Sequence, residues 1–462
     1  MMRLSEAAKA LNGKLIGEDV LFTSIGTDSR TIVKDQLFVA LRGEHFDGNV
    51  YAQESIEKGA AAAMVSDDAL DLSAGLQVSD TRLALGQLAA YWRNKFDIPL
   101  AAITGSNGKT TVKEMLASIL HAAESESAVL STKGNFNNDI GLPLTLLKLR
   151  SEHRYAVAEM GMNHLGEISY LTKIGRPTVA LINNATTAHV GELGSVEMIA
   201  QAKGEIFEGL ADDGTAIINA DDTFAPLWKT LAGKRHITTF GVDAVADVSA
   251  DYQLDSDGSS LHVRTPSGDI AIRLPVAGLH NVRNALAATA AALAMGVNLE
   301  RVKQGLESFG GVKGRLQHKA GINGALVIDD TYNANPASMR AAIDVLAARS
   351  GDKLLVLGDM GELGDDASAM HTSIGQYAKQ SGISTLYTLG ELSRDMAAAF
   401  GANAQHFDTP ETLAASVAKS MTTHSTVLVK GSRFMRMERV VGLLVQADEQ
   451  NIKANIKDGG AH

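Results

Sequence analysis

The chain has 462 residues, which is long enough for two to four domains. Its content of 45% hydrophobic and 21% charged residues is that of a globular protein, and a net charge of −11 without a Lys/Arg cluster argues against nucleic acid as the main partner. Because the chain has no cysteine, disulfides, thiolate metal sites and a cysteine nucleophile are excluded. Neither a signal peptide nor an apolar run of roughly 18 residues is present, so we expect a cytoplasmic protein without a membrane span.

Residues 1–83 mix short strands and short helices, which indicates a small α/β module. The first helix is expected to be capped by Ser5 and to end at Gly13. Strands are predicted at 35–41 and 61–66, followed by a helix over 81–96.

The next part of the chain has the rhythm of a doubly wound parallel sheet. The apolar segment 98–104 predicts a strand that is covered on both faces, and a glycine-containing loop and an amphipathic helix from Lys109 follow it. Further strands are predicted at 155–160, 178–184 and 215–220, with helices at 166–174, 195–210 and 280–296. Residues 234–276 read as an antiparallel insert, because short β-like runs flank a PSGD turn.

Three glycines in FGGVKGR (309–315) predict a hinge and a domain boundary. Beyond it a second, Rossmann-like parallel sheet is expected, although no GxGxxG follows a strand there. Its predicted strands are 325–330, 353–359, 384–390 and 425–431. The expected domains are therefore 1–83, 84–313 and 314–462, all of α/β class.

The stretch TGSNGKTT (104–111) differs from the usual phosphate-binding loop because Ile103 stands where that pattern opens with glycine. Backbone N–H groups at the start of a helix still make an anion site, and Lys109 adds a positive charge. The hydroxyl of Thr110 is a candidate Mg²⁺ ligand. The ATP-binding candidates of this stretch are Gly105, Ser106, Asn107, Gly108, Lys109, Thr110 and Thr111.

Glu159 and His189 lie at or just beyond the ends of predicted parallel strands, the sheet edge at which α/β proteins bind ligands. Glu159 is a candidate Mg²⁺ carboxylate and His189 a candidate imidazole ligand. Taken singly, each could be an ordinary loop residue. Lys203 lies on a helix beside apolar residues, and its spacing alone fits a lysine with its head in water.

Four further polar residues are candidates for nucleotide contacts. Asn281 and Asn284 share a helix face by their i, i+3 spacing and could read a base or fix a loop. Arg315, at the hinge, has the planar guanidinium that suits phosphate oxygens. Asn335 precedes Pro336, so helix capping is its simpler role.

Together and in this order, these segments resemble the Mur ligases, which form amide bonds with ATP during peptidoglycan precursor synthesis. The resemblance covers essentially the whole chain and favours the branch that adds D-alanyl-D-alanine to a UDP-N-acetylmuramoyl tripeptide. In this family the loop has the form TGxNGKT, so the absence of the first glycine is normal. The segments that carry the resemblance are TGSNGKTT, GNFNNDIGLP (134–143), EMGMNHLGEI (159–168), AKGEIF (202–207), GRL (314–316), DDTYNANP (329–336) and LGDMGELG (358–364).

The resemblance implies the role of each site residue. Lys109 would contact the β- and γ-phosphates, Thr110 and Glu159 would hold one Mg²⁺, and His189 a second. Lys203 would carry a CO₂-derived carbamate that reaches a magnesium ion. Asn281, Asn284 and Asn335 would surround the adenine, with Arg315 and Asp330 at the γ-phosphate and ribose. The residues implied for the UDP-sugar substrate are Ser29, Arg30, Phe46, Asp47, Gly48, Asn135, Asn137 and Asn138.

The implied reaction is the formation of an amide through an acyl phosphate, with small molecules as the only partners and a monomer as the expected state. The nearest alternative is a related ligase that adds one amino acid to a UDP-muramoyl dipeptide, or glutamate to a folate. A phosphate-loop ATPase switch and a nucleotide-binding protein without catalysis are the alternatives outside this chemistry.

Overall fold

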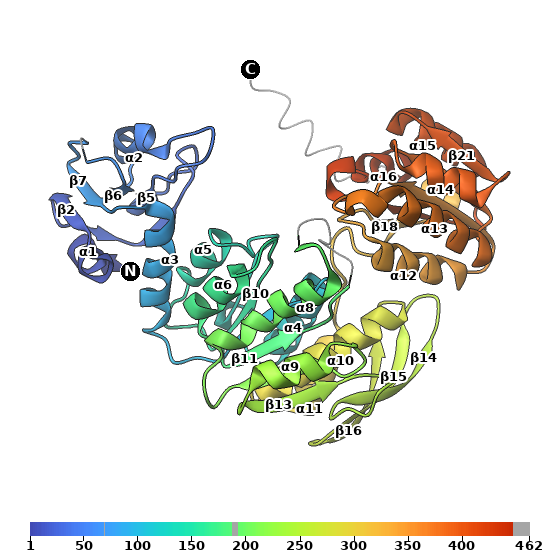
Figure 1. The fold of residues 1–462 in the computed structure, drawn as a ribbon, viewed down its shortest axis with the longest axis horizontal. Helices are drawn as coiled ribbons and strands as arrows, with labels where there is room; N and C mark the ends of the chain where they lie inside the picture. The colour runs from blue at the N-terminus through green and yellow to red at the C-terminus, as the bar shows by residue number, and fades with distance from the viewer. Residues whose placement is uncertain (69, 187–192, 447–462) are drawn as a thin grey trace.

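The computed structural model describes residues 1–68, 70–186 and 193–446, which form three α/β units in a row (Figure 1). The first unit is a five-stranded sheet in the order β2-β7-β6-β5-β4, parallel except for β2. The predictions of strands at 35–41 and 61–66 are confirmed by β5 and β6. The elements are β2 (Lys14–Gly17), β4 (Ser24–Gly26), β5 (Gln36–Val39), β6 (Ala62–Val65), β7 (Ala74–Gln77), α1 (Leu4–Leu11) and α2 (Ala52–Glu57), with the short pair β1 (Met2–Arg3) and β3 (Leu21–Phe22).

Both predicted ends of the first helix are wrong. The N-cap residue is Arg3, and the backbone N–H and hydroxyl of Ser5 donate instead to the carboxylate of Asp19, each over 2.9 Å. The helix ends at Asn12, whose φ of 50° lies in the left-handed region, one residue before Gly13. Asparagine tolerates this conformation better than most residues do. The Asp19 carboxylate therefore accepts hydrogen bonds at the start of the helix, as a local cap residue would.

Helix α3 (Thr81–Arg93) connects the first unit to the second. On one side, the hydroxyl of Tyr91 donates to Glu6 over 3.0 Å. On the other, the indole of Trp92 donates to the carbonyl of Leu149 over 3.1 Å, and the Arg93 guanidinium donates to the carbonyl of Gly175 over 3.1 Å. One continuous apolar cluster runs from the first unit through α3 into the second. The expected boundary between residues 83 and 84 therefore falls inside a helix that both units share.

The second unit is built on six parallel strands in the order β13-β12-β11-β8-β10-β9. The strand predictions are confirmed, because buried parallel strands are uninterrupted apolar runs. The strands are β8 (Leu100–Thr104), β9 (Val129–Ser131), β10 (Tyr155–Glu159), β11 (Val179–Ile182), β12 (Thr215–Asn219) and β13 (His236–Phe240). The helices are α4 (Lys109–Ala123), α5 (Gly141–Leu146), α6 (Glu167–Gly175), α8 (Val196–Gly204), α9 (Ala225–Ala232), α10 (Leu279–Ala294) and α11 (Leu299–Glu307).

The antiparallel insert is present but shorter than predicted. Strand β13, inside the predicted span 234–276, pairs in parallel with β12 and completes a β–α–β unit through α9. The insert is the antiparallel sheet β14 (Ser249–Leu254), β15 (Ser259–Thr265) and β16 (Gly268–Leu274). Its inner face packs on the core of the second unit beneath α10 and α11.

The third unit has the predicted second sheet, in the order β17-β18-β22-β19-β20-β21. Only β17, at the edge, runs antiparallel. Separate apolar clusters cover its two faces. Its elements are β17 (Gln317–Ala320), β18 (Leu326–Asp330), β19 (Asp352–Gly358), β20 (Thr385–Leu389), β21 (Ala404–Phe407), β22 (Ser425–Lys430), α12 (Pro336–Ala347), α13 (Ala367–Gln380), α14 (Ser393–Phe400), α15 (Pro410–Ser420) and α16 (Glu438–Leu444). Within the described residues, no helix combines the length and apolar character needed to cross a membrane.

Candidate active site

The loop between β8 and α4 requires glycine at its last position. Gly108 has a φ of 80°, a conformation that L side chains rarely adopt. A Cβ atom there would also lie 2.4 Å from the side-chain amides of Asn183 and Asn284. The loop is thus pressed against two neighbouring elements, and it leads directly into the start of α4, where the N–H groups of a helix N-terminus suit an anion.

Two asparagines that the sequence analysis did not select hold this loop in place. The side-chain oxygen of Asn184 accepts the N–H of Asn107 over 2.8 Å, and the Asn183 and Asn184 amides donate to the carbonyl of Asn107 over 3.0 and 3.1 Å. Both follow β11, which pairs directly with β8. Two adjacent asparagines at the end of the predicted strand 178–184 were the available signal.

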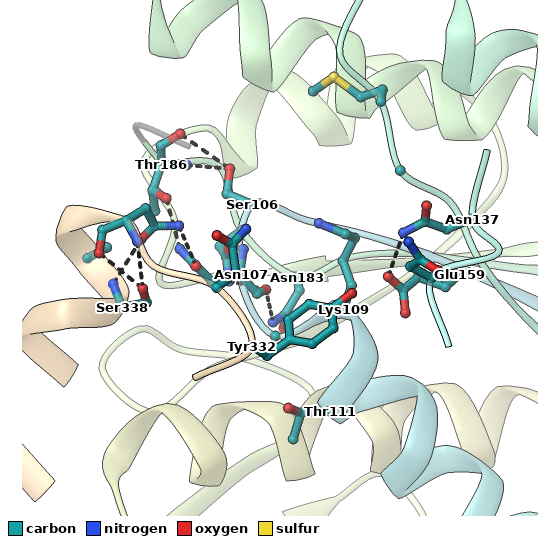
Figure 2. Close-up of a pocket in the computed structure, with 18 of the residues that line it drawn as sticks. Ser106, Asn107, Lys109, Thr111, Asn137, Glu159, Asn183, Thr186, Tyr332 and Ser338 are labelled. Carbon is teal, nitrogen blue, oxygen red and sulfur yellow. Dashed lines mark hydrogen bonds between the residues drawn. The ribbon is translucent and has the colours of Figure 1, made fainter. Parts of the chain in front are cut away.

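Lys109 begins α4, and in Figure 2 its side chain lies between Ser106 and Glu159. Its ammonium donates to the carbonyl of Gly105 over 2.6 Å. Burial lowers the pKa of Lys109, with the nearby Glu159 charge opposing this effect and Arg315 adding to it. A phosphate anion at this position would stabilise the charged amine.

Glu159, at the end of β10, is buried in a set of oxygen and amide groups. One carboxylate oxygen accepts the hydroxyl of Thr110 over 2.9 Å, and the other accepts the amide of Asn137 over 2.8 Å. The backbone N–H of Glu159 donates to the hydroxyl of Thr132 over 3.1 Å. The Thr110 and Glu159 oxygens are the hard ligands that Mg²⁺ prefers. Among the described residues no group of three acidic or histidine side chains gathers, so such an ion would take its remaining ligands from phosphate and water.

Two residues of the third unit reach this loop. The guanidinium of Arg315 donates to the Thr110 hydroxyl over 3.0 Å and lies over the ring of Tyr332, 4.3 Å from its centroid. The amide of Asn335 donates to the side chain of Asn107 over 2.8 Å. The capping prediction for Asn335 is confirmed too, because Asn335 and Ser338 form a reciprocal capping box on α12.

These groups face a cleft of about 1660 Å³. The residues that line it come from α3, from the second unit and from the third unit. Of the residues predicted from the sequence, the cleft brings together Ser106, Asn107, Gly108, Lys109, Thr111, Asn135, Asn137, Asn138, Glu159, Asn281, Asn284, Arg315, Asp330 and Asn335. Gly105, Thr110 and Lys203 are not among the residues that line it. The five predicted residues of the first unit, Ser29, Arg30, Phe46, Asp47 and Gly48, do not line it.

Those five residues belong to two loops of the first unit whose charges are already paired locally. Arg30 pairs with Asp28 over 2.8 Å, and Asp47 pairs with Arg42 over 2.8 Å. Phe46 is 59% exposed. The structure therefore leaves their predicted contact with the UDP-sugar untested.

Lys203, on α8, is 2% exposed. Burial lowers the pKa of its amine well below the usual value, and the positive charge of Lys109 acts in the same direction. No described residue accepts a hydrogen bond from this amine. The prediction of a lysine with its head in water is thus wrong for Lys203, whose buried surroundings favour the neutral amine. His189 lies outside the described residues.

Other side chains that line the cleft were not selected from the sequence. Lys430, at the end of β22, pairs with Asp330 over 2.7 Å and donates to the carbonyl of Asn333 over 2.8 Å. Arg82, on α3, donates to Asp139 over 2.9 Å through one guanidinium nitrogen. These contacts join segments that are far apart in the sequence, and no local pattern predicts them.

Comparison with known families gives three matches along the chain. Residues 21–93 match the model described as Mur ligase family, catalytic domain. Residues 103–292 match the Mur ligase middle domain, and residues 314–433 match the Mur ligase glutamate ligase domain.

Relatives of known name cover nearly the full length. The UDP-N-acetylmuramoyl-tripeptide--D-alanyl-D-alanine ligase of Escherichia coli K12 is 42% identical over 446 residues, which is 96% of this chain and 98% of the relative. The ligase of the same name from Haemophilus influenzae is 44% identical over 453 residues, 96% of this chain and 98% of the relative.

Solved structures agree with these matches. MurF from Acinetobacter baumannii superposes with a TM-score of 0.89 at 40% identity, covering 95% of this chain and 97% of that one. MurF ligase from Thermotoga maritima in complex with ADP has a TM-score of 0.81 at 25% identity, covering 92% of this chain and 98% of that one.

Proposed function

The chain belongs to the Mur ligase family, and from this premise we propose that it joins D-alanyl-D-alanine to UDP-N-acetylmuramoyl-tripeptide at the expense of ATP. The observation that carries the proposal is the 42% identity to the Escherichia coli ligase of that name over 96% of the chain. The product would be the UDP-N-acetylmuramoyl-pentapeptide of peptidoglycan synthesis. ATP, Mg²⁺ and two small-molecule substrates suffice for this activity, and a cytoplasmic monomer is the form we propose.

The three units divide the substrates among them. We assign the UDP-sugar to residues 1–83, ATP to 84–313 and the incoming dipeptide to 314–462. The loops that carry Ser29, Arg30, Phe46, Asp47 and Gly48 would hold the UDP-sugar, and Asn135, Asn137 and Asn138 the part of this substrate that enters the cleft. The last three line the cleft beside Glu159, which supports this assignment.

The chemistry starts from a carboxylate, which does not react with an amine in water because its leaving group is poor. Transfer of the γ-phosphoryl group of ATP to the tripeptide carboxylate gives an acyl phosphate, and the dipeptide amine then displaces phosphate from its carbonyl. The N–H groups of the β8–α4 loop and the Lys109 ammonium would hold the phosphates. Asn281, Asn284 and Asn335 would position the adenine, and Asp330 the ribose.

Mg²⁺ held by Thr110 and Glu159 would neutralise charge on the transferred phosphoryl group. We assign His189 and a carbamate on Lys203 to a second Mg²⁺ site. A neutral, buried amine is the form that captures CO₂, and the lowered pKa of Lys203 supports this assignment. Arg315 is placed to exchange its bond to Thr110 for one to a γ-phosphate oxygen. Contacts from the third unit also shield the acyl phosphate from water.

Phosphate release measured with defined substrate pairs tests the proposal. We expect release only when ATP and Mg²⁺ are offered with UDP-N-acetylmuramoyl-tripeptide and D-alanyl-D-alanine together. A UDP-muramoyl dipeptide with a single amino acid, or a folate with glutamate, should give little. Rapid ATP hydrolysis without any acceptor would contradict the proposal and indicate an ATPase switch.

A further inference from the structure

Helix α12 of the third unit lies along the seam with the second unit (Figure 1). Its first residues contact the phosphate-binding loop through the bond from Asn335 to Asn107. Near its other end, the side chain of Val345 packs against Gly278, where a Cβ atom would lie 2.9 Å from it. The seam therefore continues well beyond the nucleotide cleft.

The seam ends at an ion pair outside the cleft. Arg349, two residues after α12, donates to the carboxylate of Asp257 over 2.8 Å. Asp257 lies in the turn between β14 and β15 of the insert, so the pair joins the third unit to the second. Neither residue lines the cleft, and the reaction described above uses neither.

Each partner is also held by contacts within its own unit. The Arg349 side chain is only 9% exposed, and its second terminal nitrogen lies 2.9 Å from Nε2 of His318. Because arginine can only donate, this nitrogen of His318 accepts, and the imidazole is neutral. Burial and the Arg349 charge both lower the pKa of His318, which agrees with that form.

The turn that carries Asp257 is braced within its own sheet. Arg273 binds Asp255 through two bonds of 2.5 and 3.0 Å, and Asp255 accepts the backbone N–H of Asp257 over 3.1 Å. Asp257 itself is 68% exposed, so its carboxylate reaches outward from a fixed turn. A buried guanidinium aimed at such a carboxylate loses little side-chain entropy when the pair forms.

We propose that Arg349 and Asp257 form a latch that holds the third unit closed over the nucleotide cleft, with the insert serving as its anchor. The latch acts on the position of Arg315 and Asn335 and touches no substrate, so both of its members are positioning residues. The inference rests on the proposed function only for its kinetic consequence, because the closure itself can be measured without any reaction.

Closure can be followed by fluorescence transfer between dyes. The chain has no cysteine, so Lys229→Cys on α9 and Lys419→Cys on α15, both exposed, give two unique labelling sites. In this background we expect Asp257→Asn to lower the ratio of closed to open molecules about two- to fivefold, the range for a partly exposed ion pair. Asp257→Glu, which keeps the carboxylate, should restore most of the ratio.

Asp251→Asn is the matched control, because Asp251 is a 74% exposed aspartate of the same sheet that pairs with Arg264 within that sheet. It should leave the ratio unchanged. Equal ratios for Asp257→Asn and Asp251→Asn, or equal losses in Asp257→Asn and Asp257→Glu, would overturn the latch.

The kinetic readout is separate. If only closed molecules bind ATP productively, Asp257→Asn should raise the KM for ATP by the factor by which the fraction of closed molecules falls, and it should leave kcat nearly unchanged. A lower kcat at an unchanged KM would contradict the latch. Failure of the ligase reaction in the unaltered chain would overturn the proposed function and leave the fluorescence result standing.

Discussion

Lys203 shows how burial can convert a common surface residue into a reactive one. Its amine lies in the interior beside the positive charge of Lys109, and both effects favour the neutral form that attacks CO₂. A carbamate would turn this buried base into an anion that suits a metal ion.

We predict that Lys203→Ala lowers ligase activity at least about a hundredfold, because the metal-binding anion is lost. Added formate or acetate should restore part of the activity by supplying a carboxylate in the vacated space. Phosphate release with and without the additive measures both effects, and Lys229→Ala, on the exposed side of α9, is the control. Full activity of Lys203→Ala without an additive would exclude the carbamate.

His280 gives the protein a pH dependence of stability. Burial lowers the pKa of His280 to about 4, with Asp330 and Asp344 raising it and Lys430 and Arg283 lowering it further. The unfolded chain binds a proton near pH 6.5, so the unfolded state holds more protons than the folded state between about 6.5 and 4. The contribution of His280 to the free energy of unfolding should therefore fall as the pH falls through this window.

We therefore predict that part of the acid sensitivity depends on His280. Urea unfolding curves at pH 7 and pH 5 should show a smaller loss of stability for His280→Gln than for the unaltered chain. Equal losses in the two proteins would mean that His280 is protonated in the folded state at pH 5.

At the scale of single residues, the sequence predicted which residues share the phosphate loop, because a strand, a glycine turn and a helix form one local unit. It also placed Glu159 at the correct sheet edge, since parallel strands end together. It did not predict the bonds from Asn183 and Asn184, because these depend on which strand lies next to β8. The burial of Lys203 depends on packing from several elements and was also beyond a local pattern.

At the scale of elements, the most predictable parts were the buried strands, whose continuous apolar runs fix both their type and their approximate bounds. Errors arose where an element depends on a distant partner. The carboxylate of Asp19 starts α1 from outside the helix, and β13 belongs to the parallel sheet because of its pairing with β12. Neither relation can be read from the segment itself.

Substitutions at the start of helix α12 can separate the two roles of Asn335, helix capping and contact with the nucleotide site. Asn335→Ala and Ser338→Ala each remove one side of the capping box, so each should cost about 1 kcal/mol of stability, measured as the change in denaturant midpoint. Only Asn335 also contacts the phosphate loop. We expect Asn335→Ala, and not Ser338→Ala, to raise the KM for ATP severalfold. Equal KM values for the two variants would remove Asn335 from the nucleotide site.

At the scale of the whole molecule, the two sheets could be predicted and their relative placement could not. The bond from Arg315 to Thr110 spans 205 positions of the chain, and only the folded structure brings its ends together. The two partners belong to different units, so the candidate active site is assembled only where the second and third units meet.

Nucleotide binding should therefore stabilise the molecule as well as supply the phosphate. At a nucleotide concentration 100 times its Kd, the expected gain is about 2.7 kcal/mol, seen as a higher Tm in a thermal shift assay. With ADP alone the gain should be smaller than with ADP and Mg²⁺, because Glu159 then faces the phosphates without a cation between them. An identical Tm with and without Mg²⁺ would argue against a metal at Thr110 and Glu159.

The helix shared by the first two units limits where this enzyme can be divided into fragments that fold. A fragment that starts at residue 84 would begin inside α3 and expose apolar side chains whose partners stay on the missing piece. Such a fragment should aggregate when expressed alone. The third unit has its own apolar clusters, so a cut near residue 314 would disturb the packing less. Chimaeras between species are therefore better joined there. Exchange of the first unit between relatives would have to carry α3 with it.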